Sequence, residues 1–284
     1  NAASAWTTGL ISEPTSTSFQ VGAGGGVNND GITYVAYVFA HDEPVFGTNK
    51  DESIIKCGSF TTNGSSQASI DLGFEPQWLI YKRSDGGSEN WQMLDVMRGW
   101  TVNTSGAIEL QANTNFAEAA NNGNKPTSSG FLLDGGHSNN ATYVYIAIRR
   151  SNKPPETGTD VFGIDKLDGP QSSPAFRTGV VTDMGWARRR SSGTYYGAGM
   201  GVWARLTGDK YLATASADAE LTASFGGDSM IGFYNSATSP DMGYSFKRAA
   251  GFFDAVPYTG TGATNSIAHN LEVAPELTIT KVRS

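Results

Sequence analysis

The feature that most constrains the fold of this chain is an internal repeat. Residues 258–262 repeat the pattern of residues 60–64, and residues 271–281 repeat that of residues 72–82, with Pro275 at the place of Pro76. Subtracting 60 from 258 gives an offset of 198 residues, and subtracting 72 from 271 gives 199, so one residue is inserted between the two matches. Self-similarity at a fixed spacing indicates a fold made of reused units.

A half-step of the same repeat lies between these copies. Leu110 corresponds to Leu212 at an offset of 102 residues, and residues 34–39 correspond to residues 143–148 at an offset of 109. The unit is therefore about 100 residues long, the size of one small domain. The expected organisation is a closing half unit with a linker, a complete unit, a divergent unit and an opening half unit, at residues 1–50, 51–152, 153–250 and 251–284 respectively.

The two terminal half units leave two explanations open. Either the chain is a window of a longer tandem array, or the two halves complete each other in space. We favour the window. Under either explanation, an unpaired half unit leaves sheet edges exposed.

Short apolar runs separated by turn residues predict strands throughout the chain. Asn63-Gly64 and Asp85-Gly86 between such runs are the turn chemistry of hairpins. Strands are expected in the complete unit at 55–60, 68–72, 78–82, 91–94, 107–111, 131–133 and 142–148. In the divergent unit they are expected at 180–190, 195–196, 201–206, 211–212, 230–234 and 244–247. Such strand spacing predicts an all-β fold of tandem, jelly-roll-like β-sandwich units.

Two further segments carry local expectations. Residues 34–39 are apolar on both faces, which predicts a central strand covered on each side. Residues 115–120 are the one short helix candidate, and they are expected to form a turn that crosses a sheet edge.

Composition narrows the class of protein. Only 17% of the residues are charged, against about 25% in an average soluble domain, and the 35 glycines suit short strands joined by tight turns. A net charge of −7 argues against nucleic-acid binding, which needs a basic face. Cys57 is the one cysteine, so it is expected to be a small buried hydrophobic residue. No apolar run reaches the length of about 18 residues that a membrane span needs.

The sequence contains little evidence of a catalytic or metal-binding site. His41, His137 and His269 lie far apart and outside any metal-binding spacing, so each is expected on the surface or in a turn. Two acidic pairs could serve glycoside hydrolysis, which needs two carboxyl groups about 5–10 Å apart; these are Asp183 with Asp209, and Asp218 with Glu220. Glu118 repeats the position of Glu220, which favours a structural role. The sequence therefore predicts no catalytic residue, no metal and no cofactor.

Two groups of residues are candidates for ligand binding. Arg188, Arg189 and Arg190 end a predicted strand and could meet phosphates or acidic sugars of a bacterial envelope, although charges at a strand end are more often simply solvated. Aromatic residues beside glycine-rich turns could stack on sugar rings, although most aromatic residues of a sandwich pack in its core. The aromatic candidates are Trp100, Tyr195, Tyr196 and Trp203.

Three phrases of the chain resemble a known kind of protein. Residues 33–40, residues 206–212 and residues 251–262, continued by His269-Asn270-Leu271, are similar to the tandem domains of tail and tail-fibre-like virion proteins of tailed bacteriophages, particularly those of marine bacteria. One departure is Asp183-Met184-Gly185-Trp186, where the sibling units carry a proline near the strand start.

The resemblance implies a virion structural protein of the tail, often concerned with host attachment, and not an enzyme. It implies assembly in the host cytoplasm and partners among other tail proteins, with a homo-oligomer and a bacterial surface glycan as further partners and no membrane insertion. One alternative is a non-catalytic, lectin-like carbohydrate-binding module, which would be a monomer with an aromatic groove. A second is a polysaccharide depolymerase, which would need a convergent acidic pair in a cleft.

Overall fold

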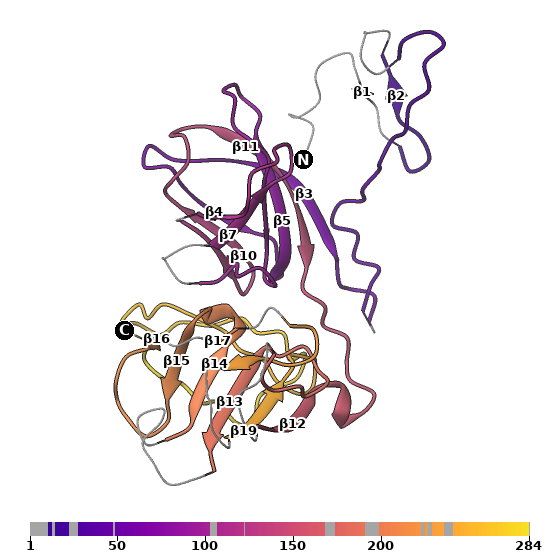
Figure 1. Ribbon diagram of the computed structural model, residues 1–284. Coiled ribbons are helices and arrows are strands. Elements are labelled where there is room, and N and C mark those ends of the chain that lie inside the picture. Colours follow the sequence, from indigo (N-terminus) through magenta and orange to yellow (C-terminus); the bar gives the residue numbers. More distant parts are fainter. Residues whose placement is uncertain are drawn as a thin grey trace.

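The computed structural model shows a chain that is built almost entirely of antiparallel β-strands. It describes residues 11–12, 15–22, 28–47, 49–102, 107–121, 123–167, 174–190, 199–222, 225–226, 229–235 and 241–283. Two layered β units follow one another along the chain, and Figure 1 shows the first above the second. The predicted all-β sandwich class is therefore confirmed.

The first unit consists of a six-stranded sheet that packs on a three-stranded sheet. The large sheet has the order β3 (Ile55–Thr61), β11 (Thr142–Arg149), β5 (Pro76–Arg83), β6 (Gln92–Asp95), β7 (Ala107–Gln111) and β8 (Ala119–Asn121). The small sheet has the order β4 (Gln67–Asp71), β10 (Gly130–Asp134) and β9 (Asn124–Thr127). Every pairing is antiparallel, so each sheet can bury one face and expose the other.

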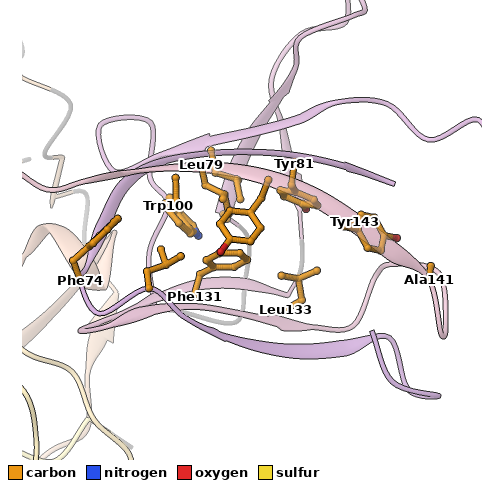
Figure 2. Packing of buried hydrophobic residues seen from close by; sticks show 13 residues of the cluster. Phe74, Leu79, Tyr81, Trp100, Phe131, Leu133, Ala141 and Tyr143 are labelled. Carbon is orange, nitrogen blue, oxygen red and sulfur yellow. The ribbon is translucent and has the colours of Figure 1, made fainter. Parts of the chain in front are cut away.

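Buried and half-buried residues alternate along the strands of the first unit, and the buried ones form its core. In β11 the inward positions are Tyr143, Tyr145 and Ala147, while their neighbours are only half-buried. Figure 2 shows the rings of Tyr81 and Phe131 packed between the two layers with other core side chains. Each fully buried large apolar side chain contributes about 1.5–3 kcal/mol, so this cluster dominates the stability of the unit.

The second unit repeats the large sheet. Its order is β12 (Phe162–Leu167), β19 (Asp241–Phe246), β13 (Met184–Arg189), β14 (Gly201–Ala204), β15 (Lys210–Ala213) and β16 (Leu221–Thr222). The opposite layer contains β17 (Phe225–Gly226) paired with β18 (Tyr234–Asn235), and a bridge between Phe176 and Phe233. Two short 3-10 helices, η2 (Gly158–Asp160) and η3 (Arg205–Thr207), lie in the connections.

The two units share one topology. In each six-stranded sheet, the first strand pairs with the last, the last pairs with the second strand in sequence order, and the remaining strands follow in sequence order. Two glycines mark the same close approach of neighbouring strands within the smaller layer of each unit. A Cβ on Gly130 would lie 1.9 Å from the Ile70 carbonyl oxygen, and one on Gly232 would lie 1.8 Å from the Phe176 carbonyl oxygen. These glycines are 102 residues apart, the half-step found in the sequence.

The two cores fill the same space with different side chains. In the first unit a large residue on the last strand, Tyr145, packs against a position that only glycine can occupy, Gly58. In the second unit Gly243 stands on the last strand, and the ring of Phe176 from the other layer lies against it. Each unit therefore places a glycine of the large sheet against an aromatic ring, but the glycine and the ring lie on different elements in the two units.

Most predicted strands are present, with instructive exceptions. All seven strands expected between residues 55 and 148 are confirmed, but β8, β9, β12, β16 and β17 were not predicted. The segment 115–120 forms no helix, and β8 begins at Ala119. The covered strand predicted at residues 34–39 is wrong for a single chain, because none of these residues is in a strand and all are exposed.

The terminal segments contain little regular structure among their described residues. A short pair joins β1 (Ile11–Ser12) and β2 (Gln20–Val21), and Phe253 forms a bridge with Ala249. Residues 254–283 form no strand. Within the part of the chain that the structure describes, no helix is long and apolar enough to span a bilayer.

Candidate functional site at the junction of the two units

The most elaborate polar arrangement lies where the two sandwiches meet. Its charged residues stand at matching places in the two units. Glu75 immediately precedes β5, and Asp183 immediately precedes β13. Arg150 immediately follows β11, and Arg248 lies two residues after β19. Because β5 pairs with β11 and β13 pairs with β19, each unit brings one acid and one arginine to the same end of its sheet.

Arg248 is the centre of this junction. Its side chain is 1% exposed, and its Nη1 donates a hydrogen bond of 2.7 Å to Glu75 Oε2 of the other unit. Its Nε lies 3.8 Å from Asp183 Oδ1, and its backbone N–H donates to Asp183 Oδ2 at 2.7 Å. One arginine thus joins the acid of its own unit to the acid of the neighbouring unit.

Arg150 completes the junction from the first unit. Its Nε lies 3.7 Å from Glu75 Oε2, and its Nη2 lies 3.5 Å from Asp254 Oδ1. Its Nη1 also donates to the Arg248 carbonyl oxygen at 3.4 Å. Asp254 in turn accepts the backbone N–H of Asn270 at 2.8 Å, which ties the C-terminal segment to the junction.

A second contact between the units involves η3. Arg205 Nη2 donates to the Thr182 carbonyl oxygen at 2.7 Å, and its Nη1 lies 3.2 Å from the sulfur of Met97 in the first unit. The backbone N–H of Val102 donates to the Leu206 carbonyl oxygen at 2.8 Å. The connection between β6 and β7 therefore rests on η3, and the two units touch at more than one place.

The charges of the junction balance. Three arginines, Arg150, Arg205 and Arg248, face three carboxylates, Glu75, Asp183 and Asp254. Burial of a charge costs several kcal/mol unless the partner charge is close, so the set is stable only as a complete group. The junction therefore fixes how one unit sits on the next.

The pKa values of the two central arginines, Arg248 and Arg150, are shifted in opposite directions. Burial lowers the pKa of Arg248, but the charges of Glu75 and Asp183 outweigh this effect and raise it above its ordinary value. Burial and the like charge of Arg248 lower the pKa of Arg150. Arg248 is thus the cation that the surrounding carboxylates hold most strongly.

A separate polar cluster lies at the other end of the first sandwich. Glu89 Oε1 accepts from Ser138 Oγ at 2.6 Å, and Glu89 Oε2 accepts from Tyr143 Oη at 2.9 Å. Burial and the hydrogen bond to Glu89 raise the pKa of Tyr143 to about 12. His137 Nε2 contacts Asn124 Oδ1 at 3.0 Å, so this imidazole is not placed to take the Ser138 proton. The cluster stabilises the connection between β10 and β11, and it lacks the serine–histidine contact of a nucleophilic site.

Two of the four aromatic residues predicted to bind a ligand are buried in separate cores. Trp100 and Trp203 are 0% and 1% exposed, so the prediction that a sugar stacks on them is wrong, and both indoles pack in cores. Trp100 lies in the core of the first unit and Trp203 in that of the second. Tyr195 and Tyr196 lie outside the described residues.

The predicted arginine group lies at the end of β13. Arg188 and Arg190 are exposed, and Arg189 is half-buried. Arg188 Nη1 donates to the Gly199 carbonyl oxygen at 2.7 Å, and Arg189 Nε lies 3.8 Å from the buried Asp241. The group therefore has partners within its own chain, and its proposed contact with envelope glycans stays a prediction.

The acidic pairs weighed for hydrolysis have partners elsewhere. Asp183 belongs to the junction, and Glu220 forms a two-point pair with Arg283 at 2.5 and 2.9 Å. His137 is half-buried against the rings of Tyr81 and Tyr143 rather than on the surface. In the described ranges, no group of three or more His, Cys, Asp or Glu residues is arranged to hold a metal ion.

Comparison with known proteins adds a family. A domain family of unknown function, DUF7483, matches residues 1–152, which is more than half of the chain. The chain belongs to the DUF7483 family. No curated protein and no solved structure matches it. The DUF7483 match ends two residues after Arg150, so its boundary coincides with the junction between the two units.

The junction was not predicted from the sequence, although a signal was present. An acid stands just before the second strand of each six-stranded sheet, and an arginine stands just after its last strand. Neither residue is notable alone, because isolated acids and arginines occur on most surfaces. Glu75 and Asp183 are 108 residues apart and Arg150 and Arg248 are 98 apart, whereas the half-step of the repeat is 102, so the shared sheet topology shows that the two pairs are equivalent.

Proposed function

We propose that this DUF7483 protein is a structural component of a bacteriophage tail or tail fibre, in which rigidly joined β-sandwich units carry host-attachment surfaces away from the particle. The observation that carries the proposal is the junction of two units with the same topology through a buried, charge-balanced group that includes Arg248 and Glu75. The resemblance of the repeats to tail and tail-fibre-like domains adds the biological setting.

The mechanical part of the proposal follows from the junction. A flexible linker would let the two sandwiches move independently, whereas buried ion pairs and direct contacts between Arg205 and Met97 hold them in one relative orientation. Units that are rigidly joined in a row extend a long way from the particle, which is what a tail fibre requires. The partners are other tail proteins and further copies of the chain.

The attachment part of the proposal concerns the end of β13. Arg188 and Arg190 are exposed residues, and guanidinium groups bind phosphates and carboxylates such as those of envelope glycans with paired hydrogen bonds. Many weak contacts of this kind, presented on several copies, would give firm attachment.

The decisive experiment is to look for the protein in virus particles. Purified particles of the phage that encodes the chain should contain it by mass spectrometry, and the two-unit structure should fit as one rigid body into tail density by cryo-electron microscopy. Absence from purified particles would refute the proposal. A fit only with the two units reoriented would refute the mechanical part and leave the location standing.

A further inference from the structure

Two apolar segments near the ends of the chain are exposed and outside any described strand. In the first, residues 33–40, Val35, Tyr37 and Val38 are 74%, 81% and 75% exposed. In the second, residues 275–282, Leu277 and Ile279 are 77% and 76% exposed. Extended apolar segments with free edges are the usual templates for pairing with another chain.

The repeat identifies what each segment corresponds to. Residues 33–40 match β11 at an offset of 109, and residues 275–282 match β5 at an offset of 199. In the first sandwich β11 and β5 are antiparallel neighbours, with Ile146 opposite Ile80 and Ile148 opposite Trp78. The two end segments are thus equivalent to two strands that pair with each other.

The same offsets of 109 and 199 give the register in which the two end segments would pair, taken from the register of β11 and β5. Tyr37 takes the place of Ile146 and Ile279 that of Ile80, so these two residues face each other. Phe39 and Leu277 form the next pair on the same face, since side chains on one face repeat every second residue.

A second stretch of the C-terminal segment corresponds to β3, the other neighbour of β11. Tyr143 pairs with Phe60 of β3, and their equivalents are Tyr34 and Tyr258. Tyr258 is 55% exposed. The segment 33–40 could therefore insert between two stretches of the C-terminal segment, as β11 inserts between β3 and β5.

We propose that residues 33–40 of one molecule pair antiparallel with residues 275–282 of a second copy, so that copies join head to tail. Within one chain the segments are held on different sandwiches. Asp42 N–H donates to the Ile55 carbonyl oxygen of β3 at 2.9 Å, which keeps the first segment beside the first unit. Lys281 Nζ and Arg283 contact Ser216 and Glu220, which keeps the second segment on the second unit.

Figure 1 shows this separation: the N-terminal segment runs along the outer side of the first sandwich, and the yellow C-terminal segment covers the second. A contact between two different surfaces of identical molecules extends without closing unless its rotation forms a ring. The proposal rests on the repeat and the register and is independent of the phage assignment.

Cysteine cross-linking between two single variants tests the proposal. In a Cys57→Ser background, which removes the one cysteine of the chain, one preparation carries Tyr37→Cys and the other Ile279→Cys. After mixing and mild oxidation, a disulfide-linked species of about twice the 30.0 kDa chain mass should form, because facing Cα atoms of paired strands lie within disulfide reach. A link between two different preparations is necessarily intermolecular.

The matched control moves the second cysteine by one residue. Tyr37→Cys mixed with Thr280→Cys should give several-fold less product, since a shift of one residue places the side chain on the opposite face. Equal yields for the two mixtures, or no product from either, would overturn the proposed pairing.

Light scattering on the unmodified chain provides a measurement that does not depend on the variants. The mass should rise with concentration above that of one chain, and Tyr37→Asp should reduce the association at least several-fold. A monomer at all concentrations overturns the proposal, as does an oligomer that Tyr37→Asp leaves unchanged. Neither result bears on whether the protein is found in virus particles, so the two proposals fail separately.

Discussion

Replacement of Arg248 by methionine is the sharpest perturbation of the junction. The side chain is 1% exposed, and its partner Glu75 is 4% exposed, so neither charge can regain water without separating the two units. Arg248→Met would leave three carboxylates facing two guanidinium groups. Loss of one partner of a buried ion pair costs about 3–5 kcal/mol, because the remaining charge stays buried without compensation.

Urea unfolding measures this cost. With an m-value near 3 kcal/mol/M, the expected loss lowers the midpoint by about 1 M or more. Lys153→Met is the matched control, since it removes a cation whose pair with Glu156 is exposed, and its midpoint should equal that of the wild type. Tryptophan fluorescence and far-UV circular dichroism should report the same shift.

A double-mutant cycle separates the pair from its surroundings. Glu75→Gln removes the partner charge, so in the combined variant the buried carboxylate left by Arg248→Met is also gone. The two losses should sum to more than the loss in the combined variant, by about 0.5–3 kcal/mol. Additive losses, or an Arg248→Met protein within about 0.5 kcal/mol of wild type, would refute the reasoning.

Three further changes test other parts of the structure. Gly130→Ala and Gly232→Ala each force a Cβ to within 2 Å of a carbonyl oxygen on the neighbouring strand of the same layer, so each should lower the free energy of unfolding by about 1–3 kcal/mol or more. Gly64→Ala, where nothing lies within 4 Å, should not. Burial lowers the pKa of His137, so the unfolded chain binds that proton more tightly and stability should fall as the pH drops through about 6.5; urea midpoints from pH 8 to pH 5 should show this loss, and His137→Gln should flatten it. Trp203→Ala should cost about 3–5 kcal/mol in a thermal melt, as for other buried large side chains; a variant with the wild-type melting temperature that loses glycan binding would contradict the assignment of this indole to the core.

The strands of the first unit could be predicted because their signals are local. Apolar runs between Asn63-Gly64, Asp85-Gly86 and similar turns determine both the number and the approximate bounds of the main strands. The strand β9 was missed because it contains Pro126 and three polar residues, and only its pairing with β10 makes it a strand. Likewise β12 contains Gly163 and follows a segment with Pro154, Pro155 and Gly158, a composition that is typical of a linker and not of a strand.

The candidate site could not be predicted because its signals are not local. Arg248 and Glu75 are 173 residues apart in the chain and meet only after both sandwiches have formed. The exposure of Trp100 and Trp203 was misjudged for a related reason. A tryptophan near glycine-rich turns has the same sequence context whether its ring points outward or into the core, and the packing of the second layer decides between them.

Alignment of the terminal segments with the complete unit distinguishes two kinds of connection between units. One is the ionic junction within a chain, and the other is the proposed apolar strand pairing between chains. The position of Arg150 is taken by His41 in the N-terminal segment, at the offset of 109, and the position of Glu75 by Ala274 in the C-terminal segment, at the offset of 199. A sandwich completed from these two segments would therefore lack the arginine and acid that the complete units bring to their junction. Its contacts would instead come from the exposed apolar pairs, such as Tyr37 with Ile279. Ionic groups thus fix neighbouring units within a chain, where the covalent linkage keeps the units close together. Apolar strand pairing joins separate copies.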